Sequence, residues 1–163
     1  MTRRIDIEAT RASVANLSDG TPPEVGVRSM CEEEVENLLQ EGRWGVLCTL
    51  HEGRPYAVPV SFGYDGTDLY IASGPGRKLR ALEASPGVCL TIADVTDGNR
   101  WRSVVVIADA ERVRTVRERL HALGTIGRLV ARSRPFSRHD VLRAASATVF
   151  RLRPVEISGR VRG

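Results

Sequence analysis

Aromatic residues are scarce in this chain, and long apolar runs are absent. Phe, Trp and Tyr make up 5% of the 163 residues, too few to suggest a surface that stacks nucleic-acid bases. No apolar run approaches the roughly 20 residues that a membrane-spanning helix needs. Residues 1–20 also lack the continuous apolar core of a secretory signal. We therefore predict a cytoplasmic protein with no nucleic-acid partner and no membrane span.

Cysteine is present only as Cys31, Cys48 and Cys89. The number is odd, the three are far apart in the chain, and no C-x-x-C pair occurs, which argues against a disulfide framework and against a zinc site. Cys48 and Cys89 lie within apolar runs, so the sequence predicts reduced thiols that pack as small buried side chains. The three histidines show no metal-ligand spacing, and no metal site is predicted.

The length and the pattern of the chain indicate one domain with an N-terminal arm. A chain of 163 residues is long enough for one core and too short for two ordinary domains. Residues 1–27 mix charges, Ser and Gly around a "TPPE" break without periodicity, which predicts a flexible arm. Residues 28–163 form the predicted domain. Its first element is an amphipathic helix that begins after Ser29 as N-cap and ends at Gly42.

Six runs with β-like composition follow this helix. They are residues 44–50, 54–64, 67–73, 87–95, 101–113 and 146–163. The runs are rich in Val, Ile, Thr and Tyr, and "HEG" and "DG" between them are hairpin signals. Helical spacing of Leu interrupts the strands at residues 76–87 and again at 114–131. This order predicts a mainly β fold with short helices, closed into a six-stranded barrel that leaves few exposed edges.

A Gly-Pro-Gly turn carries Lys78, the one lysine among 24 basic residues. The turn follows a strand that ends at Ser73 and precedes a helix that begins near Arg77, an arrangement that directs free backbone N–H groups toward an anion. Gly76 permits close backbone approach, while Arg77 and Lys78 supply positive charge. The pattern favours a phosphate site, although a tight turn with solvated basic residues has the same composition. Neither a P-loop nor a G-x-G-x-x-G motif is present.

From about Met30 to Val113 the sequence resembles the pyridoxamine 5'-phosphate oxidase-like flavoproteins with the FMN-binding split barrel, especially the nitroimidazole-resistance branch. The resemblance lies in the order of a helix, a hairpin with "GRPYAVPV", a strand, "GPGRK", a strand and "RSVVV". It departs from that branch at Ala72, where relatives commonly have His. The C-terminal "EISGRVRG" also lacks a recognisable substrate-clamping arginine motif, so we do not expect this chain to make pyridoxal phosphate.

The resemblance implies an FMN site and a homodimer with the cofactor at its interface. The flavin ring would lie along residues 58–61, the phosphate in the turn of residues 73–78, and a further contact would come from the strand after it. The implied cofactor-binding residues are Val58, Pro59, Val60, Ser61, Ser73, Gly76, Arg77, Lys78, Arg102 and Ser103. No catalytic side chain is implied.

The function expected on this basis is an FMN-dependent oxidoreductase that reduces a small flat acceptor, such as a nitroaromatic or a quinone. The chemistry would belong to the cofactor, and the protein would bind and orient it. Two alternatives remain open at this point. One is a split barrel that binds a deazaflavin or haem, and the other is a non-enzymatic protein that stores or senses flavin.

Overall fold

The computed structural model describes residues 26–131 and 146–163, and nearly all of the predicted arm of residues 1–27 lies outside them. The strands are β1 (Val27–Ser29), β2 (Trp44–His51), β3 (Arg54–Tyr64), β4 (Leu69–Ser73), β5 (Gly87–Asp97), β6 (Arg100–Arg112) and β7 (Thr148–Arg162). The helices are α2 (Glu32–Glu41), α3 (Arg77–Ala84) and α4 (Val116–Ala131). Each of the six predicted strand runs forms a strand, and the predicted helices form in the expected order along the chain.

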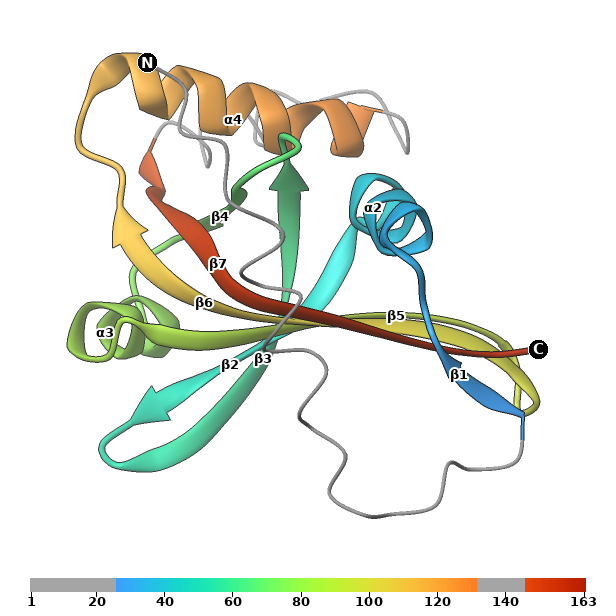
Figure 1. The fold of residues 1–163 in the computed structure, drawn as a ribbon. Coiled ribbons are helices and arrows are strands. Elements are labelled where there is room, and N and C mark those ends of the chain that lie inside the picture. Colours follow the sequence, from blue (N-terminus) through green and yellow to red (C-terminus); the bar gives the residue numbers. More distant parts are fainter. Residues whose placement is uncertain (1–25, 132–145) are drawn as a thin grey trace.

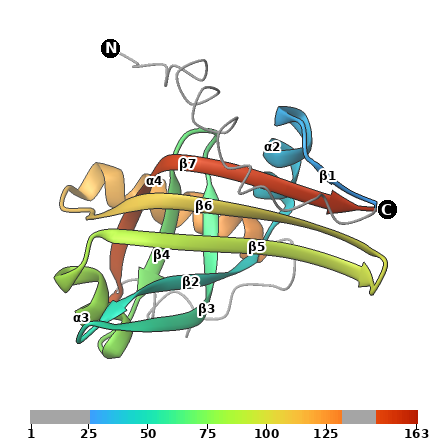
Figure 2. The same cartoon turned by 60° about the horizontal axis from the view of Figure 1, so that its bottom comes forward.

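All strand pairs are antiparallel, and six strands close into a barrel (Figures 1 and 2). The order is β7-β4-β3-β2-β5-β6, and β6 pairs back onto β7 over most of its length. The mainly β, six-stranded barrel is therefore confirmed. A seventh strand, β1, adds to the end of β7, where Val27 lies opposite Arg162.

The barrel interior is filled by alternate residues of the strands, as the pleat requires. Leu47, Leu90 and Phe62 are fully buried there, and Phe150 from β7 completes the same cluster. Side chains between these positions point outward and are partly or wholly exposed. The alternation explains why the strand runs could be recognised in the sequence.

The helices cover the ends and sides of the barrel (Figure 1). Helix α4 packs on β3, β4 and β7. Helix α2 begins two residues later than predicted, because Ser29 continues β1 opposite Arg160 and Cys31 takes the N-cap position. The Cys31 backbone N–H donates to the Glu34 carboxylate at 2.9 Å, which fixes this first turn. None of the helices in the described ranges is long and apolar enough to cross a membrane.

The barrel is split between β3 and β4. These two strands pair only from Phe62 opposite Ile71 to Tyr64 opposite Leu69. Beyond Phe62 the rest of β3 keeps its pairing with β2 on one side and has no strand partner among the described residues on the other. This free edge and the turn after β4 lie on the two sides of the split.

Candidate functional site

The split brings together two of the three predicted groups of cofactor contacts. Residues 58–61 belong to the free edge of β3, and the turn of residues 73–78 follows β4 directly after the last paired residues. A direct contact joins the two sides, because the Arg77 guanidinium carbon lies 5.8 Å from the centre of the Tyr56 ring on β3. The two segments therefore border one region of the surface.

Gly76 is the N-cap of α3 and holds a backbone conformation that disfavours other residues. Its φ of 144° is one that L side chains rarely adopt, and nothing lies within 4 Å of a Cβ built there. Likewise, nothing lies within 4 Å of a Cβ built at Gly74. The turn thus presents bare backbone at a helix N-terminus, with room beside it for a ligand. A serine at position 76 would be strained, which explains why glycine stands there.

Lys78 is partly buried in this turn. Its Nζ donates to the Ala72 carbonyl at 3.4 Å, and no carboxylate of the described residues forms an ion pair with it. Burial lowers the pKa of Lys78 because the charged form loses solvent. A desolvated ammonium without a carboxylate is costly unless an anion accompanies it.

The first turn of α3 holds cations where the helix dipole favours anions. Arg77 and Lys78 lie in that turn, no acidic residue accompanies them, and Arg80 follows as a third cation on the helix. Positive charge at a helix N-terminus is unfavourable by itself, since the terminus already carries partial positive charge. A bound phosphate would reverse the sign of this contribution.

Ser73 is buried at the start of the turn, so its place as a predicted phosphate contact stays a prediction. Its side chain is buried, with 1% exposed, and its hydroxyl donates to the Gly74 carbonyl at 2.9 Å. The hydroxyl therefore stabilises the turn in this conformation, and its proton is not directed at a ligand.

The residues of β3 divide between the two faces of the sheet. Val60 is buried in the barrel core and Val58 packs against that core, whereas Pro59 and Ser61 point to the opposite face. A ring lying along this segment would contact the backbone edge, Pro59 and Ser61. The valines hold the strand in place from inside.

Arg102 and Ser103, the third predicted group, lie elsewhere in the same chain. Strand β5 begins soon after the turn and α3, and its first residue, Gly87, lies opposite Asp109 of β6. Ser103 is six residues from Asp109 along β6, a separation of about 20 Å. Arg102 is held on the inner side by Glu41 of α2 at 2.9 Å and by Asp94 at 3.0 Å. Within one chain these two residues and the turn do not form one site.

One contact at the split was not predicted from the sequence. Tyr56 contacts Arg77, and the aromatic residue in "GRPYAVPV" was the available signal.

Cys48 and Cys89 were predicted to be buried, but both are partly exposed on the outside of the barrel, directly opposite each other on β2 and β5. This correction follows from their register, because both point away from the core, unlike their neighbours Leu47 and Leu90.

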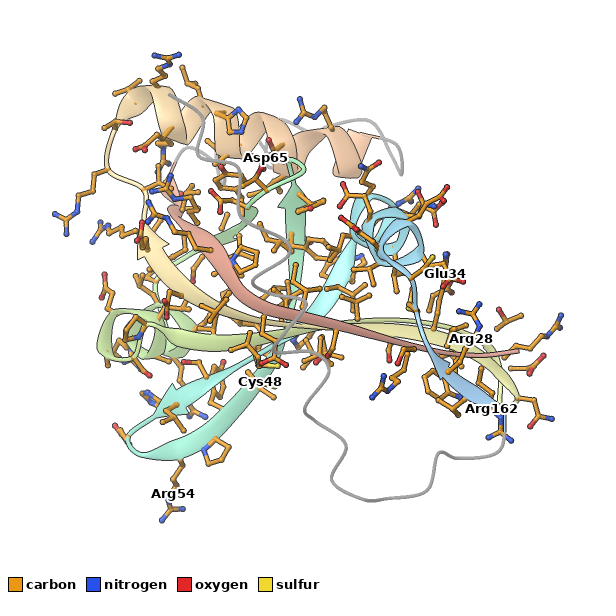
Figure 3. All side chains as sticks on the ribbon, viewed as in Figure 1. Arg28, Glu34, Cys48, Arg54, Asp65 and Arg162 are labelled. Carbon is orange, nitrogen blue, oxygen red and sulfur yellow. The ribbon has the colours of Figure 1, made fainter. Side chains whose placement is uncertain are left out.

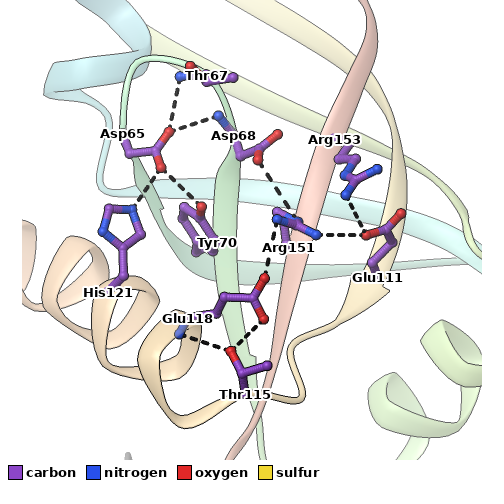
Figure 4. Close-up of polar contacts among 10 residues, drawn as sticks. All are labelled: Asp65, Thr67, Asp68, Tyr70, Glu111, Thr115, Glu118, His121, Arg151 and Arg153. Atoms are coloured by element: carbon purple, nitrogen blue, oxygen red, sulfur yellow. Dashed lines mark hydrogen bonds and ion pairs between the residues drawn. The ribbon is translucent and has the colours of Figure 1, made fainter. Parts of the chain in front are cut away.

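A second polar cluster joins α4 to β4 and β7 (Figure 4). The His121 ring lies 2.8 Å from the Asp65 carboxylate, which also accepts from the Tyr70 hydroxyl at 3.0 Å. Burial alone would raise the pKa of Asp65, but hydrogen bonds from the Asp68 N–H, His121 and Tyr70 outweigh it and lower the pKa. Arg151 bridges Asp68, Glu111 and Glu118.

This cluster borders a cleft of about 500 Å³, lined by Tyr70, Val113, Thr115, Arg117, Glu118, His121 and Arg151. Most of its charged groups already have partners, so its evident effect is to fix α4 on the barrel. In the described ranges no three His, Cys, Asp or Glu side chains come close enough together to hold a metal ion.

The chain matches known proteins in sequence. The model of the family described as pyridoxamine 5'-phosphate oxidase matches residues 31–161, most of the chain. An uncharacterized protein from Rhizobium meliloti is 32% identical over 100 residues, which are 59% of this chain and 66% of that relative. The match thus spans slightly less than two thirds of the relative's length.

Solved structures show the same fold. A FAD-binding protein from Mesorhizobium loti is 28% identical, with a TM-score of 0.68 over 84% of this chain and 99% of its own. A candidate 5-nitroimidazole antibiotic resistance protein from Bacteroides thetaiotaomicron is 26% identical, with a TM-score of 0.68 over 83% of this chain and 89% of its own. With the family match over residues 31–161 and the split barrel described above, the chain belongs to the pyridoxamine 5'-phosphate oxidase-like family of split-barrel proteins.

Proposed function

We propose that this protein is an FMN-dependent oxidoreductase that reduces a small flat acceptor, such as a nitroaromatic or a quinone. One observation carries the proposal: Lys78 is partly buried with no carboxylate partner in residues 26–131 and 146–163, in a glycine turn at the N-terminus of a helix whose first turn has no acid. These features together match what a phosphate monoester requires.

The turn supplies the phosphate contacts. Backbone N–H groups at the start of α3 point toward the open space beside Gly74 and Gly76, since a helix leaves its first N–H groups unbonded. Lys78 contributes a compact positive charge, and Arg77 contributes a planar pair of hydrogen-bond donors beside it. Arg77 also stacks over Tyr56, so its position is partly fixed before a ligand binds.

The flavin ring would lie along the free edge of β3. Backbone donors and acceptors on an unpaired strand edge can bind the polar edge of a flat heterocycle, as they would bind another strand. Pro59 and Ser61 flank this edge on the outer side. Bound FMN would accept hydride and pass electrons to the acceptor. The chain's residues would bind and orient the cofactor, and no side chain is needed as a general base.

We also propose that two copies pair through the outer face. We use this name for the outward side chains of β2, β5 and β6, namely Trp44, Val46, Cys48, Leu50, Cys89, Val95 and Ile107. Trp44 is 65% exposed and Val95 is 67% exposed, so large apolar side chains stand in solvent on one side of the sheet. Exposed apolar patches of this kind mark interaction surfaces.

A second copy would also account for Ser103. It points to the outer face, opposite Ala93, far from the turn of its own chain. Pairing through this face offers Ser103 of one copy a route to the site of the other, with the cofactor at the interface. Arg102 points inward and is occupied by Glu41 and Asp94, so we assign it a structural role.

The relatives support a flavin and this class of acceptor. The Mesorhizobium loti structure is described as FAD-binding, and the Bacteroides thetaiotaomicron structure as a candidate nitroimidazole resistance protein. Both exceed 25% identity to this chain. We favour FMN because a single glycine turn with Arg77 and Lys78 suits one phosphate group.

The test is the absorption spectrum of the purified protein with mass spectrometry of the ligand released by heat, followed by turnover of NADH or NADPH with a nitroaromatic acceptor. Released FMN and steady turnover support the proposal. Recovery of a deazaflavin or haem would replace the cofactor assignment. Tight FMN binding with no reduction by either nicotinamide donor would favour a storage or sensing role.

A further inference from the structure

We propose that Cys48 and Cys89 form a dithiol site that hydrogen peroxide closes to an intramolecular disulfide. The observation is their register. Strands β2 and β5 pair antiparallel with Cys48 directly opposite Cys89, although 40 other residues separate them in the chain. Figure 3 shows Cys48 near the centre of the sheet, where several strands cross in the view.

The backbone already has the spacing that a disulfide needs. Residues directly opposite each other on antiparallel strands point to the same face, with Cα atoms about 4.5 to 5.5 Å apart. Disulfides span Cα separations of about 4.4 to 6.8 Å. The two sulfur atoms can therefore be joined with only a small local movement of the two strands.

The bond would be easily reduced. Opposed Cβ atoms in a sheet lie about 4.5 to 5.5 Å apart, whereas disulfides hold theirs at about 3.5 to 4.5 Å. Closing the bond therefore draws β2 and β5 slightly together at one point. Strained disulfides have more oxidising potentials and open readily with thiol reductants. This describes a reversible site and not a permanent cross-link.

The surroundings favour reaction between these two thiols. Both are free cysteines with partial exposure to solvent. On the other side of each cysteine, Ala57 of β3 lies opposite Cys48 and Ile107 of β6 lies opposite Cys89. Neither side chain is a nucleophile that could compete with the second thiol. Cys89 Sγ contacts the Thr91 hydroxyl at 3.9 Å, a weak interaction that leaves the thiol available. After one sulfur is oxidised, the other is the adjacent nucleophile, and proximity favours its attack.

The reaction balances with one peroxide. One cysteine, as its thiolate, attacks a peroxide oxygen, which breaks the O–O bond and forms a sulfenic acid with release of one water after protonation. The second thiolate then attacks the sulfenic sulfur and displaces hydroxide, which leaves as a second water. The two thiols lose two electrons and two protons in total, and the peroxide is reduced to two waters.

The site lies on the outer face, which we propose pairs two copies of the chain. The register joins cysteines of one barrel, so the disulfide connects β2 to β5 and does not cross-link the copies. Its geometry is independent of flavin binding. A pair that covers the outer face would slow access of peroxide, so the test includes a variant in which that face is disrupted.

The experiment uses the full chain with Cys31→Ser, which removes the exposed third thiol, and the same protein with Trp44→Glu. Each is treated with hydrogen peroxide, quenched with a maleimide and analysed by intact mass, peptide mapping and a non-reducing gel. We expect loss of two hydrogen atoms, no maleimide adduct, a linked peptide pair containing Cys48 and Cys89, and full reversal by dithiothreitol.

Two matched controls define the outcome. Cys48→Ser and Cys89→Ser, each in the Cys31→Ser chain, should retain one thiol and show no loss of two hydrogens. The proposal is overturned if both thiols still take maleimide in the Trp44→Glu protein. It is equally overturned if the thiols become separate sulfinic acids, or if the linkage joins two chains. None of these readouts depends on a bound flavin, so failure here and failure of the proposed function are distinct.

Discussion

At the scale of single residues, Lys78 is the side chain that we propose binds the cofactor phosphate, and its burial is unfavourable in the free protein. Its ammonium is partly buried in the first turn of α3, and among the described residues its side chain donates only to the Ala72 carbonyl. The folded protein therefore holds the Lys78 proton less tightly than the unfolded chain does, because burial lowers its pKa. This penalty is present at neutral pH and disappears as pH rises above the lowered pKa.

Lys78→Met should separate binding from stability. We expect FMN affinity to fall about 10- to 100-fold, since hydrogen bonds to charged groups contribute about 1.5 to 3 kcal/mol. The melting temperature of the flavin-free protein should not fall, because the change removes a desolvated charge. Fluorescence titration with FMN and thermal melting measure the two effects.

The matched control for this change is Arg80→Met, which removes an exposed cation from the same helix. It should lower FMN affinity much less than Lys78→Met. Equal losses for the two variants would show that only the general positive charge of α3 matters and that Lys78 has no special position.

At the scale of elements, the contact between β1 and α2 depends on one ion pair. Arg28 donates to both oxygens of Glu34 at 2.8 and 2.6 Å (Figure 3), and the Cys31 N–H donates to the same carboxylate. The Arg28 hydrogen bond is the largest reason why the pKa of Glu34 falls from 4.5 to about 2. A carboxylate with a depressed pKa in the folded state contributes stability above its unfolded value and loses it in acid.

Glu34→Gln should therefore destabilise the protein in a pH-dependent way. The melting temperature of the variant should lie below that of the original chain at pH 6, and the difference should shrink between pH 4.5 and about 2. Melting curves across this range measure it. A difference that stays constant with pH would show that the carboxylate charge is not responsible.

The approach of β3 to α4 depends on Gly63. A Cβ at this position would lie 2.6 Å from the Ile126 backbone nitrogen and 2.7 Å from the Thr125 carbonyl carbon. Because both atoms are backbone, neither can rotate away. Gly63→Ala should destabilise the protein by about 1 to 3 kcal/mol, as overpacked core positions do. Denaturant unfolding measures the change.

Gly87→Ala in β5 is the control, since nothing lies within 4 Å of a Cβ built there. It should be close to neutral. If both variants lose the same stability, the loss comes from a general response of strand glycines, and the close packing of α4 is not its cause.

The sequence predicted the elements better than their arrangement. Alternation and hairpin signals located six strands, because each depends on neighbouring residues. Strand β1 was missed because Val27, Arg28 and Ser29 are too few to show a pattern, and their pairing with β7 joins the two ends of the chain. Ser29 was assigned as a helix cap for the same reason.

In the candidate site, too, local features could be predicted from the sequence and long-range pairings could not. The turn at Ser73 to Lys78 is local, so its shape followed from glycine and helix signals. The register of β2 with β5 is set by closure of the barrel, so the pairing of Cys48 with Cys89 could not be read from spacing. The inward direction of Arg102 could not be predicted either, because its partner Glu41 lies on α2, far away in the sequence.

At the scale of the whole molecule, the proposed pairing of two copies through the outer face can be tested by one substitution. Trp44→Glu places a charge at a side chain that is 65% exposed in the single chain and would be buried in the proposed pair. We expect it to convert a dimer to a monomer, measured by sedimentation velocity. Leu120→Glu is the matched control, because Leu120 is equally exposed on α4, away from this face.

A monomer in both the original chain and the variants would contradict the proposed pairing. A dimer that survives Trp44→Glu but not Leu120→Glu would move the interface to α4.

We propose that the turn of residues 73–78 binds the phosphate of a flavin. The most direct measurement compares the affinity of the flavin-free protein for FMN with its affinity for riboflavin, which has the same ring and no phosphate. We predict that FMN binds about 100-fold more tightly, the effect of charged hydrogen bonds to one phosphate group. Equal affinity for the two flavins would contradict the account, because Arg77, Lys78 and the N-terminus of α3 would then take no part in binding.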